Sequence, residues 1–234
     1  MSDQIALNYL HVFLERHPVR TFKKREMIVF QGEAPRQAYV VKNGTVKAYN
    51  LSVSGDEKPV AFYQTDSVFP ATWVYGQESS ATYYYEAFTP QVEIYCIDRP
   101  VFVNFIKNRP ELLYHELHRI LADQLGASIR LNALQHSRAS DKLIYTLHYL
   151  ALSHGKSSGN GKIELTLDVT HQDLANLTGL TRETAATELN KLKKQGIIKY
   201  GKHTPYQLNL ARLTRLLNDE FIADLANTSV SSAA

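Results

Sequence analysis

The residues from 170 to 198 carry the most specific chemistry in this sequence. Arg182 and Glu183 lie at the start of an expected helix, with Thr184 beside them and Thr187 one turn further along. An arginine can donate two parallel hydrogen bonds to guanine, and a glutamate can accept one from the amino group of cytosine. Such side chains at a helix N-terminus are typical of a recognition helix that reads base edges in the DNA major groove.

Other polar residues of the segment suit the DNA backbone. Thr170, Gln172 and Lys191 lie where they could contact phosphate or sugar, and such contacts position a protein without reading sequence. The full set of expected DNA contacts is Thr170, Gln172, Thr181, Arg182, Glu183, Thr184, Thr187, Lys191 and Lys202.

Two short helices and a hairpin must position these side chains. Thr170 can cap the first helix with Asp173 in the capping-box position, and Gly179 suits the tight turn at its end. Thr181 can cap the second helix, and Gly196 ends it before residues 197–203, which favour a β wing. The expected buried positions of the helices are Leu174, Ala175, Leu177, Ala185, Leu189 and Leu192. The pattern predicts a winged helix-turn-helix.

The charge distribution agrees with this interpretation. The chain has a net charge of +3; residues 1–137 hold 14 Lys and Arg against 14 Asp and Glu, and residues 138–234 hold 12 against 9. Within 178–202 the balance is six to two. A local basic patch is expected where a protein contacts phosphates, although a solvated helix face would show the same charges.

A long helix is predicted from the Arg109-Pro110-Glu111 start to about residue 137. Its apolar residues alternate spacings of four and three, which is typical of a coiled-coil seam. A second stripe (Leu121, Leu125 and Ile129) lies beside the first. We interpret one stripe as packing on the chain's own β domain and the other as a homodimer interface; the alternative is a helix packed within a monomer. The expected dimer residues are Leu113, Leu117, Ile120, Gln124, Ala127, Leu131 and Leu134.

Residues 20–100 have the pattern of a β domain. Short strands are expected around the hairpin signal Asn43-Gly44, after the turn at residues 54–57, and over 60–63, 83–87 and 92–97. Near-regular strands with glycine turns favour a barrel-like or sandwich fold.

The remaining segments complete the expected organisation. Residues 138–141 suggest a hinge in which Ser140 or Asp141 caps the next helix (142–153), followed by a flexible loop over 155–161 and a strand over 163–167.

The order and lengths of these parts resemble the cyclic-AMP receptor protein / fumarate–nitrate regulator (CRP/FNR) family of bacterial transcription factors, over roughly residues 20–210. The closest likeness is from Gln172 to Ala175 and from Gly179 to Thr184. The resemblance implies that Arg182 and Glu183 read a G·C pair in each half-site. The family's usual second base-reading arginine falls on Thr187, so the half-site should overlap the common one without being identical.

The resemblance also implies an α+β fold with these domains: a β-roll sensor of the cyclic-nucleotide-binding, jelly-roll type over 1–109, a dimerisation helix over 110–137, a winged helix-turn-helix over 138–226 and a disordered tail over 227–234. The expected partners are a pseudo-palindromic double-stranded DNA operator, a second copy of the chain and RNA polymerase.

The sensor segment departs from the cyclic-AMP-binding pattern of that family. Phe69-Pro70-Ala71 replaces the family's Gly-Glu, and no Lys or Arg lies between Lys58 and Arg99 to hold a phosphate. A buried phosphate needs a cation or a nest of backbone amides. The sequence therefore predicts a regulator that does not bind cyclic AMP.

The same region is rich in aromatic residues, which leaves two alternatives. An apolar or aromatic effector could stack inside the roll, or the roll could be filled by its own side chains. The candidate effector residues are Phe69, Thr72, Trp73, Tyr75, Ser79, Thr82, Tyr83 and Ser128.

The remaining chemistry is sparse. Cys96 is the single cysteine, which excludes an internal disulfide and a cysteine-ligated iron–sulfur cluster; it is expected to be buried and inert, with a redox switch as the alternative. Glu111, His115 and His118 share a helix face and are expected to form a surface or dimer-edge cluster rather than a metal site.

No cofactor, metal or set of catalytic residues is predicted, so we expect no enzyme. No membrane span or secretory signal is visible, and we expect a cytoplasmic protein. The alternative function is a cyclic-nucleotide-like binding module that regulates a protein partner.

Overall fold

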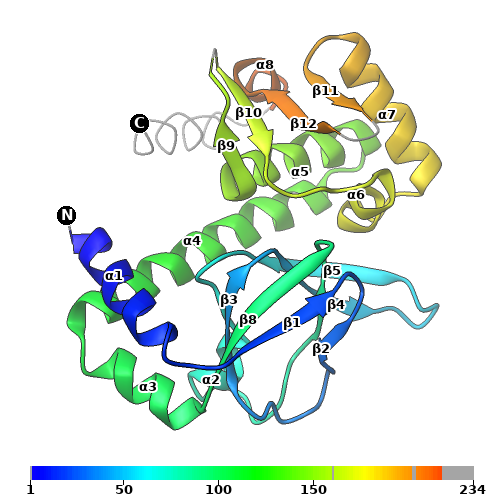
Figure 1. Cartoon of the computed structure of the whole chain (residues 1–234). Coiled ribbons are helices and arrows are strands. Elements are labelled where there is room, and N and C mark those ends of the chain that lie inside the picture. Colours follow the sequence, from blue (N-terminus) through cyan, green and yellow to red (C-terminus); the bar gives the residue numbers. More distant parts are fainter. Residues whose placement is uncertain (1, 160, 202–203, 218–234) are drawn as a thin grey trace. The chain divides into compact units, whose positions relative to one another are not determined.

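A computed structural model describes residues 2–159, 161–201 and 204–217 of the chain. The chain forms two compact units, residues 1–119 and 120–234, and the boundary between them falls inside the longest helix (Figure 1). The expected fold class is confirmed: a β-rich N-terminal domain, a long helix and a C-terminal helix-turn-helix.

The N-terminal unit is built around two antiparallel sheets, ordered β1-β8-β3-β6 and β2-β7-β4-β5. The strands are β1 (Val19–Lys23), β2 (Met27–Val29), β3 (Ala38–Asn43), β4 (Val46–Leu51), β5 (Glu57–Tyr63), β6 (Val68–Phe69), β7 (Tyr84–Ala87) and β8 (Gln91–Ile97).

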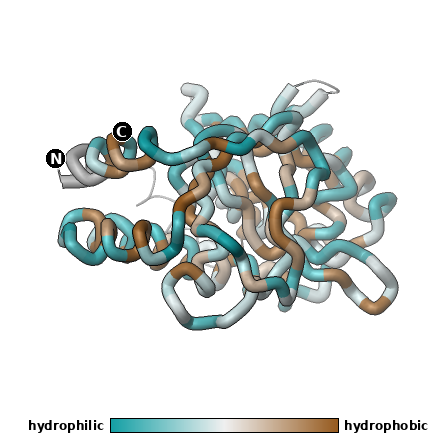
Figure 2. Tube along the Cα trace, turned by 60° about the horizontal axis from the view of Figure 1, so that its bottom comes forward, coloured by the Kyte–Doolittle hydropathy of each residue, from teal (hydrophilic) through white to brown (hydrophobic). Residues whose placement is uncertain are grey.

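Alternation along β3 places its side chains in two separate cores. Tyr39 and Val41 lie in the cluster between the two sheets, while Ala38 and Val40 lie in a second cluster. Successive side chains of a strand point to opposite faces of its sheet, so a strand covered on both faces is apolar throughout. Figure 2, coloured by hydropathy, shows several hydrophobic stretches along the trace of the chain.

Helices of this unit supply the second cluster. They are α1 (Ser2–Leu14), α2 (Ala71–Val74) and α3 (Arg99–Lys107), together with the start of α4 (Pro110–Gln135). Leu14, Phe102 and Leu112 are buried there. The helices α1, α2 and α3 are not predicted by the sequence patterns described above.

The predicted hairpin at Asn43-Gly44 is wrong, although the turn itself forms. β3 pairs with β6 and β8, whereas β4 pairs with β5 and β7, so the turn joins strands of different sheets. Gly44 has a φ of 86°, and a Cβ there would lie 2.5 Å from the carbonyl oxygen of Gln91. The turn therefore packs closely against the start of β8 and the loop before it. Only a glycine permits so close an approach.

The expected long helix is present as α4. All seven predicted seam residues are exposed, and Leu131 is 60% exposed. The second stripe is not a buried one: Leu121 and Leu125 are exposed, and only Ile129 is buried. The helix contacts the core of the N-terminal unit through Leu112 instead.

The described part of the C-terminal unit combines the end of α4 and the helices α5 to α8 with a small sheet, ordered β11-β12-β10-β9. Its helix α5 packs against α6, α7 and α8. The elements are α5 (Ala139–His154), β9 (Gly155–Ser157), β10 (Lys162–Leu165), α6 (His171–Thr178), α7 (Arg182–Lys194), β11 (Ile198–Gly201), β12 (Thr204–Asn209) and α8 (Leu210–Thr214).

Two local expectations for this unit are wrong. Helix α5 begins at Ala139 with Arg138 at the N-cap position and no side-chain cap, so Ser140 and Asp141 lie inside its first turn, where the Ser140 hydroxyl donates to Asp141. Residues Gly155–Ser157 form a strand paired with β10 rather than part of a flexible loop. A Cβ on Gly155 would lie 2.2 Å from the Ala151 carbonyl oxygen, so this glycine serves a close approach and not flexibility. The predicted disordered tail, 227–234, lies outside the described residues.

Candidate nucleic-acid interface and sensor segment

Helix α6 begins with the capping box that the sequence predicts. The backbone amide of Asp173 donates to the Thr170 hydroxyl (3.1 Å), and the Thr170 amide donates to the Asp173 carboxylate (2.8 Å). Two otherwise unpaired amides are thereby satisfied. Gly179 ends the helix in the left-handed conformation (φ 66°), as expected.

Helix α7 also begins as predicted. The Thr184 amide donates to the Thr181 side chain (3.2 Å), which fixes the first turn. Ala185, Leu189 and Leu192 are buried. The opposite side of the helix, and in particular its first turn, is therefore exposed.

The side chains expected to read bases lie on this exposed side. Arg182, Glu183 and Thr187 are exposed and Thr184 is partly buried. The Thr187 hydroxyl donates to the Glu183 carbonyl oxygen (2.9 Å), and the Thr181 and Thr184 hydroxyls are 3.0 Å apart. The side-chain polar groups of Arg182 and Glu183 therefore remain available to a ligand, whereas the threonine hydroxyls are already engaged in hydrogen bonds within the protein.

A pair of residues fastens the wing to α7. The Lys193 ammonium lies 4.4 Å from the centre of the Tyr200 ring and donates to the Tyr200 carbonyl oxygen (3.1 Å). The Tyr200 hydroxyl donates to Asn190 (3.0 Å), and the ring stacks on Tyr206 at 4.9 Å. Strand β11 is thereby held beside the helix.

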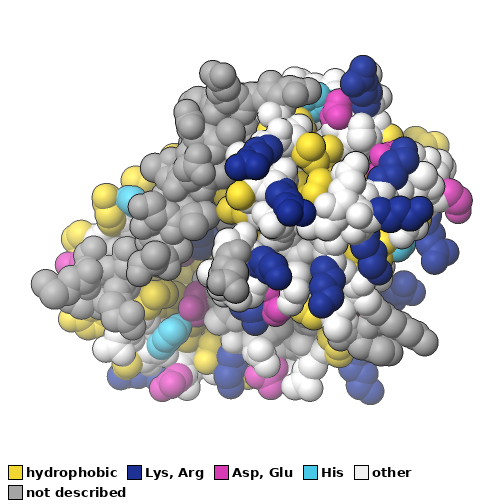
Figure 3. All heavy atoms as spheres, turned by 90° about the horizontal axis from the view of Figure 1, so that it is seen from above, with side chains coloured by type: hydrophobic (Ala, Val, Ile, Leu, Met, Phe, Trp, Pro, Cys, Tyr) yellow, Lys and Arg dark blue, Asp and Glu magenta, His cyan; other side chains and the backbone are white. Residues whose placement is uncertain are grey.

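A groove of about 780 Å³ opens between α6, α7 and the wing. The groove brings together Thr170, Gln172 and Arg182, three of the expected DNA contacts; its lining is Thr170, His171, Gln172, Arg182, Lys193, Tyr200 and Gly201. Figure 3 shows many Lys and Arg side chains on one face of the molecule that includes this unit. Lys191 lies elsewhere on α7, where it is paired with Glu188 (2.7 Å). Lys202 lies outside the described residues.

Four groove residues were not among the predicted contacts: His171, Lys193, Tyr200 and Gly201. Burial lowers the pKa of His171, and the positive charges of Arg182 and Lys193 lower it further. The groove is therefore a region of positive potential, which suits phosphate. Lys193 appeared in the sequence only as one of several basic residues, because nothing in the sequence shows that the wing folds back over it.

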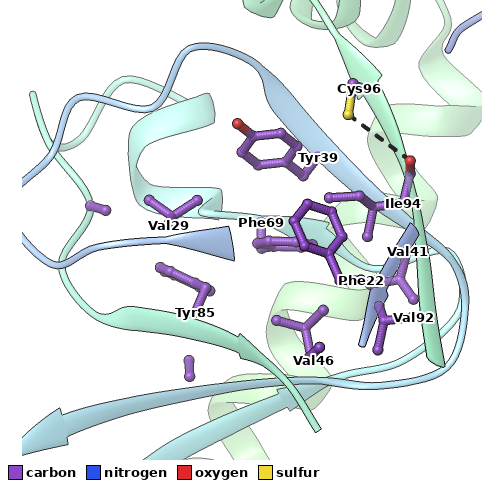
Figure 4. Close-up of a cluster of buried hydrophobic side chains, with 13 residues drawn as sticks. Phe22, Val29, Tyr39, Val41, Val46, Phe69, Tyr85, Val92, Ile94 and Cys96 are labelled. Atoms are coloured by element: carbon purple, nitrogen blue, oxygen red, sulfur yellow. Dashed lines mark hydrogen bonds between the residues drawn. The ribbon is translucent and has the colours of Figure 1, made fainter. Parts of the chain in front are cut away.

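The sensor-segment residues divide between the two cores of the N-terminal unit. Phe69 is completely buried, with ring-centre distances of 5.5 Å to Tyr39, 5.7 Å to Tyr63 and 5.4 Å to Tyr85 (Figure 4). Tyr83 packs at the edge of the same cluster. Phe69 is thus a core residue and not the wall of an open pocket.

Trp73 and Tyr75 belong to the second cluster, on the helical side. The Arg99 guanidinium lies 5.0 Å from the centre of the Trp73 ring and donates to the Val74 carbonyl oxygen (3.0 Å). The Tyr75 hydroxyl donates to buried Glu116 on α4 (2.8 Å). Both aromatic residues therefore attach the segment to helices.

The other candidate effector residues are dispersed. The hydroxyls of Thr72 and Thr82 are 3.3 Å apart, and Ser79 is exposed. Ser128 belongs to the other compact unit and donates to the Gln124 carbonyl oxygen of its own helix (3.0 Å). The structure does not gather the predicted effector residues into one site.

Four backbone amides of the sensor segment are already paired. Those of Gln77 and Glu78 both donate to the Thr72 carbonyl oxygen, and that of Gly76 donates to Trp73. The Ala81 amide donates to Glu33. These amides do not form the nest that could hold a phosphate without a cation.

Cys96 is buried, as expected. Desolvation by burial raises the pKa of its thiol, which disfavours the reactive thiolate. Among the described residues no group of His, Cys, Asp and Glu is arranged to hold a metal ion. No helix in that part of the chain is long and apolar enough to cross a membrane.

Two family models match the chain. A Crp-like helix-turn-helix domain matches residues 141–216, and a cyclic nucleotide-binding domain matches residues 19–109. The matches coincide with the winged unit and with the two-sheet roll.

Individual proteins show the same arrangement. The global nitrogen regulator of Synechococcus elongatus is 28% identical over 79% of this chain and 82% of its own length. The cyclic AMP receptor protein of Thermus thermophilus is 25% identical over 79% of this chain and 81% of its own. The structure of FixK2 from Bradyrhizobium japonicum has a TM-score of 0.69 at 21% identity, covering 87% of this chain and 98% of that one.

Proposed function

The chain belongs to the CRP/FNR family of transcription regulators, and from this we propose that it is a homodimer that binds a pseudo-palindromic DNA operator without requiring cyclic AMP. Its helix-turn-helix domain makes it a DNA-binding regulator. The proposal concerns its state of assembly, its contacts and its effector.

The single observation that carries the proposed DNA contacts is the groove between α6, α7 and the wing. Arg182 stands at its edge on the capped first turn of α7, and Lys193 lines it from the same helix. A recognition helix inserted by its N-terminus would bring Arg182 and Glu183 to base edges, while Thr170, Gln172 and Lys193 would face the backbone.

The first test is an Arg182→Ala variant measured by fluorescence anisotropy against an operator selected from a random DNA library. A lost bidentate contact to guanine should weaken specific binding by about 1–3 kcal/mol and relax the preference at one base pair of each half-site. Binding is measured without cyclic AMP, and adding cyclic AMP should leave the affinity unchanged.

A Lys58→Ala variant is the matched control, because it removes one exposed cation from the N-terminal unit. Equal effects of the two variants would contradict the assignment of Arg182. If the parent protein had no DNA affinity at any salt concentration, the alternative of a module that regulates a protein partner would replace this proposal.

The dimer is proposed from the exposed leucines of α4. Leu117, Ile120 and Leu131 are each at least 42% exposed, and together they form part of a seam with a 3.5-residue repeat. An exposed and mostly apolar stripe of this kind is explained by a partner, and a second copy of α4 presents the same repeat. Two recognition helices would then meet half-sites about one helical turn apart.

The proposed independence from cyclic AMP rests on the sensor segment. It contains no cation between Lys58 and Arg99, and its Gly76, Gln77 and Glu78 amides donate to its own carbonyls. Arg99 does contact the segment, but through the Trp73 ring and the Val74 carbonyl on the helical side. We further propose that the protein contacts RNA polymerase when bound to DNA, acts in the cytoplasm and has no enzymatic activity.

A further inference from the structure

The N-terminal unit contains a cavity of about 400 Å³ that the proposed function does not use. Arg20 of β1, Arg36 from the segment between β2 and β3, and Tyr39 of β3 all line it, and we call it the Arg20–Arg36 cavity. Its remaining lining residues are Ile28, Val29, Glu33, Ala34 and Pro35. The volume is within the range of small-molecule sites.

Both apolar and polar residues of this cavity are fixed by packing on the hydrophobic cluster between the two sheets. Tyr39 is 5% exposed, and its ring packs 5.5 Å from that of Phe69, so the hydroxyl lies at the edge of the cluster between the sheets (Figure 4). The Arg20 guanidinium lies 4.8 Å from the centre of the Phe22 ring. Val29 is buried in the same cluster and supplies a fixed apolar wall.

The two guanidinium groups lack counter-ions. Neither Arg20 nor Arg36 has a carboxylate within 4 Å in the part of the chain that the structure describes. Glu33 also lines the cavity, and its carboxylate accepts from the Phe30 backbone amide (3.4 Å). The charged lining residues therefore sum to +1.

The positive potential of this pair reaches the Tyr39 hydroxyl. Burial raises the pKa of Tyr39, the neighbouring Cys96 and, to a smaller extent, Glu33 add to the rise, and the charges of Arg20 and Arg36 both oppose it. Among the described residues the Tyr39 hydroxyl has no hydrogen-bond partner, so it can donate to a ligand in the cavity.

We propose that the Arg20–Arg36 cavity binds a small organic anion. Its carboxylate or phosphate group would lie between Arg20 and Arg36, and its apolar body would lie against Ile28, Val29 and Pro35. Arginine pairs bidentately with both kinds of anion, and these charge-assisted bonds are stronger than neutral ones. The site borders the sensor segment, because the Ala81 amide donates to the carbonyl oxygen of Glu33, but its two cations, Arg20 and Arg36, come from outside that segment.

Isothermal titration calorimetry on the full chain, at constant ionic strength, tests this with three probes of one shape. Benzoate and phenyl phosphate carry the two kinds of anion, and benzamide is the neutral analogue. We expect at least one anion to bind and benzamide not to bind, and the stronger anion identifies the preferred class. The absence of binding by both anions at millimolar concentrations would overturn the proposal.

Charge variants then locate the site. Arg36→Gln should weaken binding of the anion by about tenfold or more, as expected for a charged hydrogen bond, whereas Glu33→Gln should strengthen it. Arg36 is exposed, so this variant should fold, and its thermal unfolding is compared with that of the parent. Opposite effects of the two variants would not follow from a loss of structure.

Two controls separate this site from the DNA-binding groove. Arg182→Ala and Lys58→Gln should both leave anion binding unchanged. Loss of anion binding in Arg182→Ala, or unchanged binding in Arg36→Gln, would place the anion elsewhere and overturn the proposal. The result is independent of the DNA measurements, because failure of DNA binding leaves this titration interpretable.

Discussion

Single residues in the groove divide into those that would read sequence and those that would hold the backbone. Arg182 is exposed at the first turn of α7. Lys193 lies about three turns further along the same helix, where it is anchored to Tyr200 of the wing. A cation fixed beside the wing suits a phosphate, because a phosphate contact depends on position and not on the identity of the base.

We therefore predict that Lys193→Ala weakens binding to specific and nonspecific DNA alike and reduces the dependence of log K on log salt by about one unit. Anisotropy titrations over a series of salt concentrations measure both quantities. Lys194→Ala, one residue further along and also exposed, is the matched control. A change in base preference in Lys193→Ala would show that its role is different.

Among the described elements, α4 has an exposed apolar face that packing within a single chain does not explain. Its seam residues are exposed, although the helix is anchored through Leu112 and through buried Glu116. The Glu116 carboxylate accepts hydrogen bonds from the Tyr75 hydroxyl and from two nitrogens of the Arg119 guanidinium. The anchored side fixes which leucines face outward. The same side joins the sensor segment to α4 through the hydrogen bond from Tyr75 to Glu116.

We predict that Leu131→Glu converts the proposed dimer into a monomer, because a carboxylate would be buried at a largely apolar seam. Sedimentation equilibrium measures the mass, and circular dichroism checks that the chain remains folded. Ala122→Glu introduces the same charge on an exposed position outside the seam and should leave the dimer intact. A dimeric Leu131→Glu would argue against α4 as the interface.

At the scale of the whole molecule, the two compact units have separate cores, and acid should affect them differently. His148 of α5 is completely buried, and neither ring nitrogen has a hydrogen-bond partner among the described residues. Burial lowers the pKa of His148 to about 4 from an ordinary value of 6.5. The unfolded chain therefore takes up a proton before the folded one does.

The stability that depends on a neutral His148 is therefore fully present above about pH 6.5, and this contribution is lost as the pH falls toward 4. At pH 5.5 the loss from His148 alone should be about 1 kcal/mol, given 1.36 kcal/mol for each unit of differential pKa. Urea unfolding followed by circular dichroism should show a C-terminal transition that weakens at pH 5.5. The transition followed by fluorescence of Trp73, the single tryptophan, reports the N-terminal unit.

His148→Leu should remove that part of the acid sensitivity, and His118→Gln, which changes an exposed histidine, should not. An equal response to pH in the parent and in His148→Leu would contradict the assignment.

Much of the fold and of the DNA-binding helices could be predicted because their signals are local. Thr170, Gly179 and Thr181 act within a few residues of themselves, so their caps and turn follow from the sequence. The spacing of the α4 leucines is likewise a property of one helix. The contacts between residues that are distant in the chain could not be predicted. Asn43-Gly44 has the composition of a hairpin turn, yet the strands on either side of it, β3 and β4, enter different sheets.

The sequence by itself determined the family, the winged helix-turn-helix, the long helix and the lack of a cation in the sensor segment. Each depends on residue type and spacing along the chain. Only the tertiary structure decided that Phe69 is part of a filled core while Trp73 and Tyr75 face helices, and that Lys193 meets the wing. It alone brought Arg20, Arg36 and Tyr39 to one cavity, because such contacts depend on how distant strands pair and twist.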